Sequence, residues 1–440
     1  MSMTNFITEF LQLKDLNISI SKEISYMTKR NVKYTLLSGV LTYLPDVCPV
    51  CGSVNENCSI IKHGTKSSDI KLLPCNGNPT YLRLKKQRFL CKECGSTFSA
   101  KTDLVDTNCY ISKQVKLHII DNLRLKISEK DIAHMNYVSH STVFRAVDNC
   151  FTEFIPKHQV LPAHLMFDEF KSTKDIKGSM SFIFADATTH RILDIVPNRQ
   201  LPYLVRYFGS FSREARESVE TVCIDIYTPY MTLIKEYFPN AKIIIDRFHI
   251  VQLLNRALQK TRVDTMKKYA TSSLEYKRLK RYWKLVSKNV TELDSIDFKH
   301  RTYFKSWLSE KTLVDQCISI DEKLKNSYEV YQILLNDINK MDKNSFDLHL
   351  HRLIQEDISD RLKTAIRTLL KHKAYVLNSL DYSYSNGGIE GLNNYIKVIK
   401  RTAFGFRSFV HFRNRILISK NLVIPIKKYQ ANSDLQSLSA

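Results

Sequence analysis

The sequence predicts a multi-domain α+β protein with an N-terminal zinc ribbon, a helix-turn-helix and an α/β core that a helical insertion interrupts. Three observations lead to this prediction. Two Cys-x-x-Cys-Gly motifs begin at Cys48 and Cys91, and paired motifs of this kind are typical of a zinc ribbon. After Leu161 short apolar segments alternate with helical patterns, as in α/β domains. Residues 263–380 are polar, charged and helical in pattern, with few strand signals.

The charge balance is strongly basic. The 440 residues include 66 Lys and Arg against 44 Asp and Glu, which gives a net charge of +22 and a pI of about 9.4. A positive field of this size attracts polyanions such as DNA, and an anionic membrane surface is the competing partner. The sequence shows no apolar run long enough to span a bilayer and no secretory signal at its start. We therefore expect a cytoplasmic protein, in which ten cysteines favour metal binding over disulfides.

The predicted domain boundaries follow the changes of pattern along the chain. We expect an N-terminal helical segment at 1–44, the zinc ribbon at 45–100, the helix-turn-helix at 110–152, the first part of the α/β core at 160–262, the helical insertion at 263–380, the second part of the core at 381–425 and a polar tail at 426–440.

The first predicted metal site is built from thiolates. Two thiolates separated by two residues bind one zinc ion through a tight turn, which Gly52 and Gly95 permit, and two such turns complete a tetrahedral site. Two unrelated turns, or a redox dithiol, are the alternatives, but the matching motifs favour zinc. The expected Zn²⁺ ligands are Cys48, Cys51, Cys91 and Cys94.

The pattern between residues 112 and 150 predicts three short helices in a helix-turn-helix arrangement. The helices are expected to begin near Ser112, Ser128 and Ser139, and Phe144 of the third helix is expected to face inward. A three-helix bundle with no role in reading DNA is the alternative. In a helix-turn-helix, the first turn of the third helix reaches the edges of the bases. The side chains expected there are His140, Ser141, Thr142 and Arg145.

The residues from Leu161 onward predict three strands in series and then alternating helices and strands, which is the order of an RNase H-like core. The first strand ends at Asp168, the fourth at Asp225 and the fifth at Asp246. In this layout the carboxylates after the first and fourth strands lie side by side. Such carboxylates are costly to ionise together unless a cation neutralises them, and Mg²⁺ prefers oxygen ligands. The sequence therefore predicts a metal site at Asp168 and Asp225, with Asp246 as the alternative to Asp225.

Other acids of this region are weaker candidates. Glu169 follows Asp168 directly, so its side chain is expected on the opposite face of the strand. Asp186 and Asp194 are expected in turns or at the surface. For any single strand-terminal Asp, a role as a turn residue or a helix cap is the alternative to a catalytic one.

The remaining acidic candidate lies in a helix near the C-terminus. Ser385–Gly388 is a helix-start signal, and apolar residues recur at helical spacing from Ile389 to Ala403. Glu390 lies in the first turn of this helix, ahead of many bases and phenylalanines, as suits a metal ligand beside bound nucleic acid. The alternative is a glutamate that only interacts with the helix dipole. The bases expected to contact DNA phosphates are Lys397, Lys400, Arg401 and Arg407.

The helical insertion contains both tryptophans of the chain, Trp283 and Trp307. From Lys260 to Lys311 there are fourteen Lys and Arg against six acids. Two interpretations remain open: a clamp on DNA, or a solvated helical bundle with the tryptophans in its core.

Together these motifs resemble those of a known family. The two Cys pairs, the helix-turn-helix pattern, Asp168-Glu-Phe, Asp246-Arg-Phe-His and Asn386-Gly-Gly-Ile-Glu-Gly-Leu-Asn-Asn are similar to motifs of the bacterial insertion-sequence transposases of the ISL-three group. The resemblance covers roughly residues 45–420. It implies a DDE transposase with an RNase H-like catalytic core, in which a helical insertion precedes the catalytic glutamate.

The resemblance also implies the cofactors and partners. Asp168, Asp225 and Glu390 would hold Mg²⁺ (or Mn²⁺), and Zn²⁺ would occupy the ribbon. In similar transposases small or polar residues follow the middle Asp, whereas Ile226 follows Asp225 here, so Asp246 stays open. The implied partners are terminal inverted repeats and target DNA, and the protein would act as a homodimer at the bacterial nucleoid.

Two other functions remain open from the sequence. One is a zinc-dependent, sequence-specific DNA-binding regulator whose RNase H-like core is inactive. The other is an RNase H-like nuclease, which hydrolyses strands and never joins them. A serine or tyrosine recombinase is disfavoured, because it needs a nucleophile in an arginine-rich pocket and no metal-binding acids.

Overall fold

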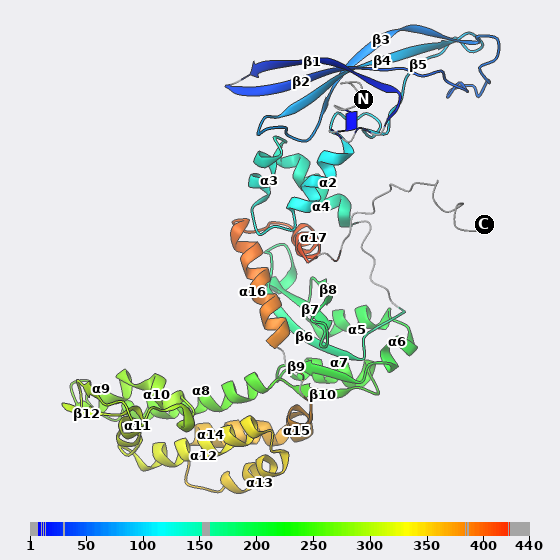
Figure 1. Ribbon diagram of the computed structural model, residues 1–440. Coiled ribbons are helices and arrows are strands. Elements are labelled where there is room, and N and C mark those ends of the chain that lie inside the picture. The colour runs from blue at the N-terminus through cyan, green and yellow to red at the C-terminus, as the bar shows by residue number, and fades with distance from the viewer. Residues whose placement is uncertain are drawn as a thin grey trace, which may run out of the picture. The chain divides into compact units, whose positions relative to one another are not determined.

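The computed structural model describes residues 8–9, 11, 13, 15–29, 31–151, 159–382, 384, 387–420 and 422. The chain divides into two compact units (Figure 1). The first unit combines Met1–Ile155 with Ile396–Ala440, and the second unit is Pro156–Tyr395. The predicted polar tail at 426–440 and the helix-start residues Ser385 and Asn386 lie outside the described residues.

The first unit begins with a five-stranded sheet. Its order is β1-β2-β4-β3, and β5 pairs with the end of β4. The pairing of β2 with β4 is parallel, and the other pairs are antiparallel. The strands are β1 (Ile18–Lys29), β2 (Val32–Leu41), β3 (Ile60–Lys71), β4 (Thr80–Cys91) and β5 (Thr97–Ser99).

The prediction of a helical segment at 1–44 is wrong for the described residues from Ile18 to Leu41, which form β1 and β2. Ile18 and Ile20 alternate with serines, and this period of two favours a strand over a helix. Thr35 of β2 pairs with Thr80 of β4. The segment is therefore part of the same sheet as the strand that ends at Cys91.

The three helices predicted after the sheet are confirmed. They are α2 (Lys113–Asn122), α3 (Glu129–Met135) and α4 (His140–Phe151). The side chains of Ser112 and Ser128 accept hydrogen bonds from the backbone N–H groups of Val115 and Asp131, so both serines cap their helices as the sequence indicates.

The turn between α3 and α4 is attached to the sheet of the same unit. Lys71, a buried residue at the end of β3, donates a hydrogen bond to the carbonyl oxygen of Tyr137. The Tyr137 hydroxyl in turn donates to the carbonyl oxygen of Gly77 at 2.6 Å. These contacts fix the start of α4 relative to the β3–β4 hairpin.

Helix α17 (Phe409–Ser419) belongs to the first unit, although its residues were predicted in the second part of the α/β core at 381–425. The side chain of His411 is buried, with Nδ1 2.8 Å from Asp148 Oδ1 and Nε2 2.8 Å from Glu129 Oε1. Phe144 stacks on this imidazole with ring centroids 4.0 Å apart, yet remains 38% exposed. The predicted inward orientation of Phe144 is therefore only partly correct.

The ion pairs of His411 lead to a pH-dependent prediction. Burial favours the neutral imidazole, but Glu129 and Asp148 outweigh this effect and raise the pKa of His411. His140 also lies 3.7 Å from Glu129. A raised folded-state pKa means that protonation stabilises the fold. The contribution is complete below the unfolded pKa of about 6.5 and is lost as the pH rises through the folded pKa.

We therefore expect His411→Gln to lower the unfolding free energy by about 3 kcal/mol near pH 6, because Glu129 then remains as a buried carboxylate without its cation. The difference between wild type and variant should shrink toward pH 9. Thermal unfolding midpoints at both pH values measure this. Equal differences at the two pH values would show that protonation of His411 contributes nothing.

The second unit contains a five-stranded sheet of order β10-β9-β6-β7-β8. Strands β6, β7 and β8 form an antiparallel meander. Strand β9 pairs in parallel with β6, and β10 pairs in parallel with β9. The predicted strand order along the chain is confirmed. The strands are β6 (His164–Lys171), β7 (Met180–Asp186), β8 (Ile192–Val196), β9 (Thr221–Ile224) and β10 (Lys242–Ile245), with α5 (Leu201–Gly209), α6 (Arg213–Glu217) and α7 (Thr228–Tyr237) between them.

Two acids on this sheet differ in their surroundings. Asp186 is the last residue of β7 and borders the turn where it was expected; its side chain accepts hydrogen bonds from the backbone of Thr188 and the hydroxyl of Thr189 in that turn. Asp194 was expected in a turn or at the surface. It is instead 2% exposed within β8 and accepts a hydrogen bond from the Tyr207 hydroxyl at 2.7 Å.

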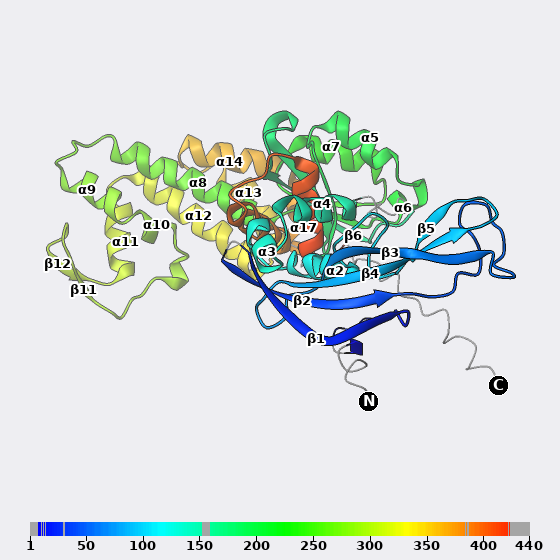
Figure 2. The same cartoon turned by 90° about the horizontal axis from the view of Figure 1, so that it is seen from above.

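A helical segment leaves the sheet after β10 and returns to it. Figures 1 and 2 show it extending away from the strands, with a short hairpin at its far end that the sequence did not predict. Asn378 at the returning end donates a hydrogen bond to the carbonyl oxygen of Ile243 at 2.8 Å. The elements are α8 (Arg247–Met266), α9 (Leu274–Arg281), α10 (Trp283–Ser287), β11 (Lys299–Arg301), β12 (Ser306–Leu308), α11 (Glu310–Ile318), α12 (Glu322–Lys340), α13 (Lys343–Leu353), α14 (Asp360–Lys371) and α15 (Lys373–Asp381).

Trp283 and Trp307 are 44% and 67% exposed, so the interpretation that buries the tryptophans in the core of this segment is wrong. The chain continues into α16 (Gly387–Thr402). Among the described helices, none combines the length and apolar character needed to cross a membrane.

Candidate metal centres

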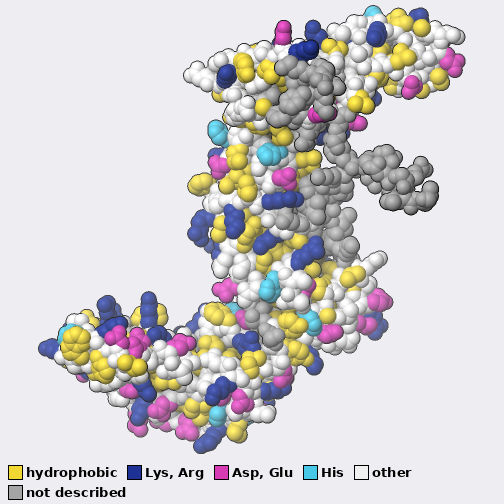
Figure 3. Space-filling view, in the orientation of Figure 1, with side chains coloured by type: hydrophobic (Ala, Val, Ile, Leu, Met, Phe, Trp, Pro, Cys, Tyr) yellow, Lys and Arg dark blue, Asp and Glu magenta, His cyan; other side chains and the backbone are white. Residues whose placement is uncertain are grey.

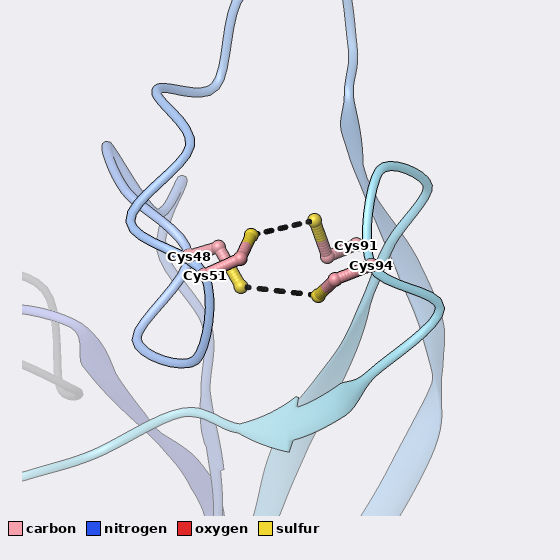
Figure 4. Close-up of side chains that lie close together, drawn as sticks. All are labelled: Cys48, Cys51, Cys91 and Cys94. Atoms are coloured by element: carbon pink, nitrogen blue, oxygen red, sulfur yellow. Dashed lines mark hydrogen bonds between the residues drawn. The ribbon is translucent and has the colours of Figure 1, made fainter.

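The four predicted zinc ligands lie together at one place in the first unit (Figure 4). Their sulfur atoms all lie within 4.8 Å of one another. Cys48 Sγ is 3.9 Å from Cys94 Sγ, and Cys51 Sγ is 3.8 Å from Cys91 Sγ. Ligands of a tetrahedral zinc ion with Zn–S bonds of about 2.3 Å lie about 3.8 Å apart. The cluster therefore fits a Zn²⁺ ion.

The backbone repeats the same geometry at both cysteine pairs. Gly52 N–H donates to the carbonyl oxygen of Cys48, and Gly95 N–H to that of Cys91, each at 2.9 Å. Both glycines have positive φ, 77° and 67°, which is the conformation that glycine adopts without strain. Ser53 hydrogen-bonds to the Cys51 thiol through its side chain and its backbone, which lowers the pKa of Cys51 to about 6. A low thiol pKa favours the thiolate that binds metal.

Three aspartates lie in a row across neighbouring parallel strands of the second unit: Asp168 within β6, Asp225 just after β9 and Asp246 just after β10. Met166 of β6 pairs with Cys223 of β9, so Asp168 and Asp225 each lie two residues beyond that pair. Ile245 of β10 pairs with Ile224 of β9, so Asp246 and Asp225 each lie one residue beyond. Because neighbouring strands are about 4.8 Å apart, the sheet register alone places Asp225 between Asp168 on one side and Asp246 on the other.

His249, in the first turn of α8, completes a second group of possible metal ligands. The ligand atoms of Asp225, Asp246 and His249 all lie within 4.8 Å of one another. His249 Nε2 is 2.8 Å from Asp225 Oδ1 and 3.9 Å from Asp246 Oδ2. The hydrogen bond with Asp225, opposed by burial, raises the pKa of His249. The side chain of Asp225 is 32% exposed and that of Asp246 only 4%.

Asp168 borders this group within β6, which continues to Lys171. Its Oδ1 accepts a hydrogen bond from the backbone N–H of Glu169 at 2.7 Å. Burial raises the pKa of Asp168 to about 7 against this hydrogen bond, and the charge of Asp225 adds to the increase. A second carboxylate nearby makes it costly for Asp168 to ionise. A cation bound between the two groups would lower the free energy of the ionised pair.

Glu169 points away from this row, as strand alternation predicts. Its two carboxylate oxygens pair with the guanidinium of Arg199 and with the Tyr230 hydroxyl, the latter at 2.7 Å. These partners explain Glu169 as a residue that connects β6 to the loop before α5 and to α7.

Helix α16 contacts the second unit's sheet region on both sides of Glu390. Asn393 Nδ2 donates a hydrogen bond to Asp168 Oδ2 at 2.6 Å. Gly388 approaches the turn after β7 so closely that a Cβ atom there would lie 2.5 Å from the ring of His190. Glu390 itself is exposed, and among the described side chains it belongs to neither cluster of three or more potential metal ligands.

Gly388→Ala tests whether this close approach positions the helix. The added methyl group must displace His190 or the first turn of α16, because real Cβ contacts are essentially never that short. We expect the variant to fold with a loss of no more than about 1–3 kcal/mol, since Gly388 is at the end of the helix. The position of Glu390 should shift, so a readout of α16, such as its hydrogen exchange, should change. Unchanged exchange would show that the contact is not needed.

The predicted DNA-contacting residues are mostly accessible. On α4, His140, Ser141 and Arg145 are exposed, whereas Thr142 is half-buried. The hydroxyl of Ser139 accepts a hydrogen bond from Thr142 N–H at 3.3 Å, which explains Thr142 as part of the helix cap.

On and after α16, Lys397, Arg401 and Arg407 are exposed and Lys400 is half-buried. Two further bases of this region, Arg413 and Arg415 of α17, are buried. Arg415 donates hydrogen bonds to the carbonyl oxygens of Leu125 and Ile127. It therefore holds the first unit together rather than facing solvent.

The sequence prediction did not single out His249 or Asn393 as members of the site. His249 could have been recognised from its place one turn after Asp246. Asn393 contacts a residue 225 positions earlier, and its local sequence gives no sign of that contact.

Two family models, both described as of transposases, match parts of the chain. A family model described as a transposase, DDE_Tnp_ISL3, matches residues 165–416, more than half of the chain. A second, described as the zinc-finger of transposase IS204/IS1001/IS1096/IS1165, matches residues 44–94. The transposase for insertion sequence element IS1001 from Bordetella parapertussis is 22% identical over 254 residues, which are 57% of this chain and 59% of that protein.

A protein named ATP-dependent protease, from Lactococcus lactis subsp. lactis, is 39% identical over 123 residues, which are 27% of this chain and 39% of that protein. This chain thus spans less than two thirds of the length of either curated relative. The Gly-x-x-x-x-Gly-Lys-Ser/Thr loop that binds nucleotide phosphates in many ATPases does not occur in this sequence.

Proposed function

Because the chain belongs to the ISL3 (ISL-three) family of transposases, we propose that it is the DDE transposase of an insertion sequence, which cuts DNA at the ends of its own element and joins those ends to target DNA. The observation that carries this proposal is the contact of Asn393 with Asp168. Residues three apart on a helix have Cβ atoms about 5–6 Å apart. The backbone of Glu390 therefore lies about one helical turn from Asn393, the residue that contacts the row of aspartates.

The sheet supports an RNase H-like core. Its order, with three antiparallel strands followed by two strands parallel to the first, is the arrangement expected for that fold. Residues 263–380 then form a helical insertion between α8 and the helix that carries Glu390. In this arrangement one acid comes from each of three elements: Asp168 from the first strand, Asp225 from the end of the fourth strand and Glu390 from the helix after the insertion.

Asp168, Asp225 and Glu390 would hold Mg²⁺ (or Mn²⁺). When bound, such ions stabilise the charge that develops on the attacking and leaving oxygens in phosphodiester displacement. The oxygen-rich donor set fits a hard cation. Asp225 is favoured over the alternative Asp246, since the side chain of Asp225 is 32% exposed and can share a cation with a DNA phosphate. Asp246, which is almost fully buried, is proposed as a positioning residue.

His249 is also proposed to position the middle acid. Its Nε2 contacts Asp225 Oδ1 at 2.8 Å, and this hydrogen bond would orient the carboxylate. Asn393 does the same for Asp168 through the oxygen that does not contact Glu169. Both aspartates thus keep fixed orientations before DNA binds.

The first unit would recognise the terminal inverted repeats. Lys71 and Tyr137 attach the turn before α4 to the sheet, so the ribbon and the three helices can bind DNA as one body. His140, Ser141, Thr142 and Arg145 are the proposed base-reading residues, whereas Lys397, Lys400, Arg401 and Arg407 are the proposed phosphate contacts. Two ends must be brought together, so we propose a homodimer on DNA, acting in the bacterial cytoplasm at the nucleoid.

An assay with purified protein tests the proposed reaction. Labelled duplexes that contain the terminal repeats are incubated with Mg²⁺ and a target plasmid, and cleaved and joined products are separated by size. We expect both products from the wild type and from Asp186→Asn, a matched control at the half-buried last residue of β7, outside the site. Binding without cleavage would indicate a DNA-binding regulator, and cleavage without joining would indicate a nuclease.

A further inference from the structure

The outer face of the β11–β12 hairpin is aromatic. His300 of β11 pairs directly with Trp307 of β12, and their rings meet edge to face with centroids 6.2 Å apart. Phe298 lies just before β11, two residues ahead of His300. The neighbouring Leu308 points the other way and is only 8% exposed. We call Phe298, His300 and Trp307 the hairpin face.

The hairpin face is open to solvent. Trp307 is 67% exposed and Phe298 is 52% exposed, and Ile296 just before them is 86% exposed. The solvent side of a two-stranded hairpin is ordinarily polar. Exposed rings gathered in one place mark a binding surface, and the core of this unit does not require them there.

The surroundings of the hairpin face are positively charged. Between residues 274 and 312 there are ten Lys and Arg and five Asp and Glu. Lys305, Lys280, Arg281 and Lys284 are exposed, and Lys284 lies over the ring of the exposed Trp283, 5.8 Å from its centroid. Figure 3 shows hydrophobic, Lys/Arg and His side chains together at this end of the helical segment. This charge favours a polyanion over an apolar protein surface as the occupant.

The hairpin is held in place from its inner side. Arg278 of α9 donates a hydrogen bond to the carbonyl oxygen of Tyr303 at 3.0 Å, and its guanidinium lies 4.2 Å from the ring centroid of Phe304. The ring of Tyr282 packs against Phe304 at 5.9 Å between centroids. An ordered surface loses less conformational freedom when it binds a ligand.

We propose that the hairpin face binds unpaired bases of DNA, which stack on Trp307 while the neighbouring lysines contact phosphates. The proposal rests on the proposed function, which makes DNA the substrate. Bases inside a duplex cover each other's faces, so a flat exposed indole has a stacking partner only where bases are unpaired. A single-stranded tail at a DNA end would supply such bases.

The chain contains only two tryptophans, which makes the test specific. In Trp283→Phe, the remaining indole emission reports on Trp307 alone. We expect a 20-nucleotide single strand to quench this emission and the matching duplex to leave it nearly unchanged. Trp307→Ala should weaken binding of the single strand about tenfold or more, whereas Trp307→Phe should retain most of it.

Controls separate stacking from charge and from misfolding. Leu348→Ala removes a 63% exposed side chain elsewhere in the same helical segment and should bind DNA like the wild type. Trp307→Ala should keep the salt dependence of binding, since stacking releases no counterions. Absence of quenching, or wild-type affinity in Trp307→Ala, would overturn the proposal. A change of Trp307 emission with protein concentration alone would also overturn the proposal, because it would show that the hairpin face contacts a second copy of the chain.

The two proposals can fail independently. Quenching by single-stranded DNA in a protein that neither cuts nor joins element ends would leave the hairpin face intact and refute the transposase reaction. If the protein cuts and joins element ends but Trp307 has no role in binding single-stranded DNA, the transposase reaction stands and the proposal for the hairpin face is refuted.

Discussion

Glu390→Gln is expected to abolish strand cleavage and to leave DNA binding intact. The amide keeps the size and shape of the side chain, but it lacks the negative charge that holds a divalent cation. Several kcal/mol of transition-state stabilisation depend on such an ion, and each 1.4 kcal/mol corresponds to a factor of ten in rate. Cleavage should therefore fall by about 10³-fold or more.

The fold should tolerate this change. Glu390 is exposed in the first turn of α16, and substitutions at exposed positions usually alter the unfolding free energy by no more than about 0.5 kcal/mol. Glu236→Gln, at an exposed position on α7 of the same unit, is the matched control and should cleave normally. Normal cleavage by Glu390→Gln would reject Glu390 as a catalytic residue. Loss of binding together with cleavage would place Glu390 in the DNA-contacting surface instead.

Replacing both Cys91 and Cys94 by Ser should unfold the ribbon and remove sequence-specific binding. Structural zinc sites contribute about 10–16 kcal/mol of binding free energy, which is as large as the whole stability of a typical domain. Cys91 is fully buried and ends the strand β4 that also pairs with β2, β3 and β5. Loss of the ion should therefore disrupt the sheet as well as the cysteine turns.

Zinc content and DNA binding measure the effect. We expect about one zinc ion per wild-type chain and almost none in the double variant, with specific affinity reduced by about 10²-fold or more. The second unit has its own core and should remain folded. Cys58→Ser, an exposed cysteine of the same region that is not part of the cluster, is the control. Retained specific binding in the zinc-free double variant would contradict the role given to the ribbon.

Some parts of the structure could be predicted because the signal is local. Cys48-x-x-Cys51-Gly contains within five residues the ligands and the turn that a zinc ion needs, so its pairing with Cys91 and Cys94 follows from chemistry alone. Apolar runs that end in an acid, such as the strand before Asp225, likewise define both a strand and its end. The helix caps at Ser112 and Ser128 belong to the same class.

Other parts depend on contacts between distant segments. The alignment of Asp168, Asp225 and Asp246 in one row depends on the register of two parallel strand pairs, β6 with β9 and β9 with β10, which local patterns do not specify. The contact of Asn393 with Asp168 joins residues far apart in the chain. The assignment of α17 to the first unit depends on the burial of His411 beside Glu129, a polar contact that apolar periodicity cannot reveal.

Short strands were missed for a different reason. β11 and β12 have three residues each, which is too few for alternation to be distinguished from chance. β1 and β2 are long enough, but Lys22 and Glu23 interrupt the alternation of apolar and polar residues within β1. The exposure of Trp307 therefore depends on a hairpin that the sequence did not predict. For the same reason the sequence left two roles open for this segment, a clamp on DNA and a helical bundle with buried tryptophans.

The most direct test of the account is to locate divalent cations in crystals of the protein grown with element-end DNA and Mn²⁺, by the anomalous scattering of manganese. The account predicts manganese bound by Asp168, Asp225 and Glu390 at the end of β6 and β9. Manganese held only by Asp225, Asp246 and His249, with the Glu390 side chain turned away from it, would contradict the account.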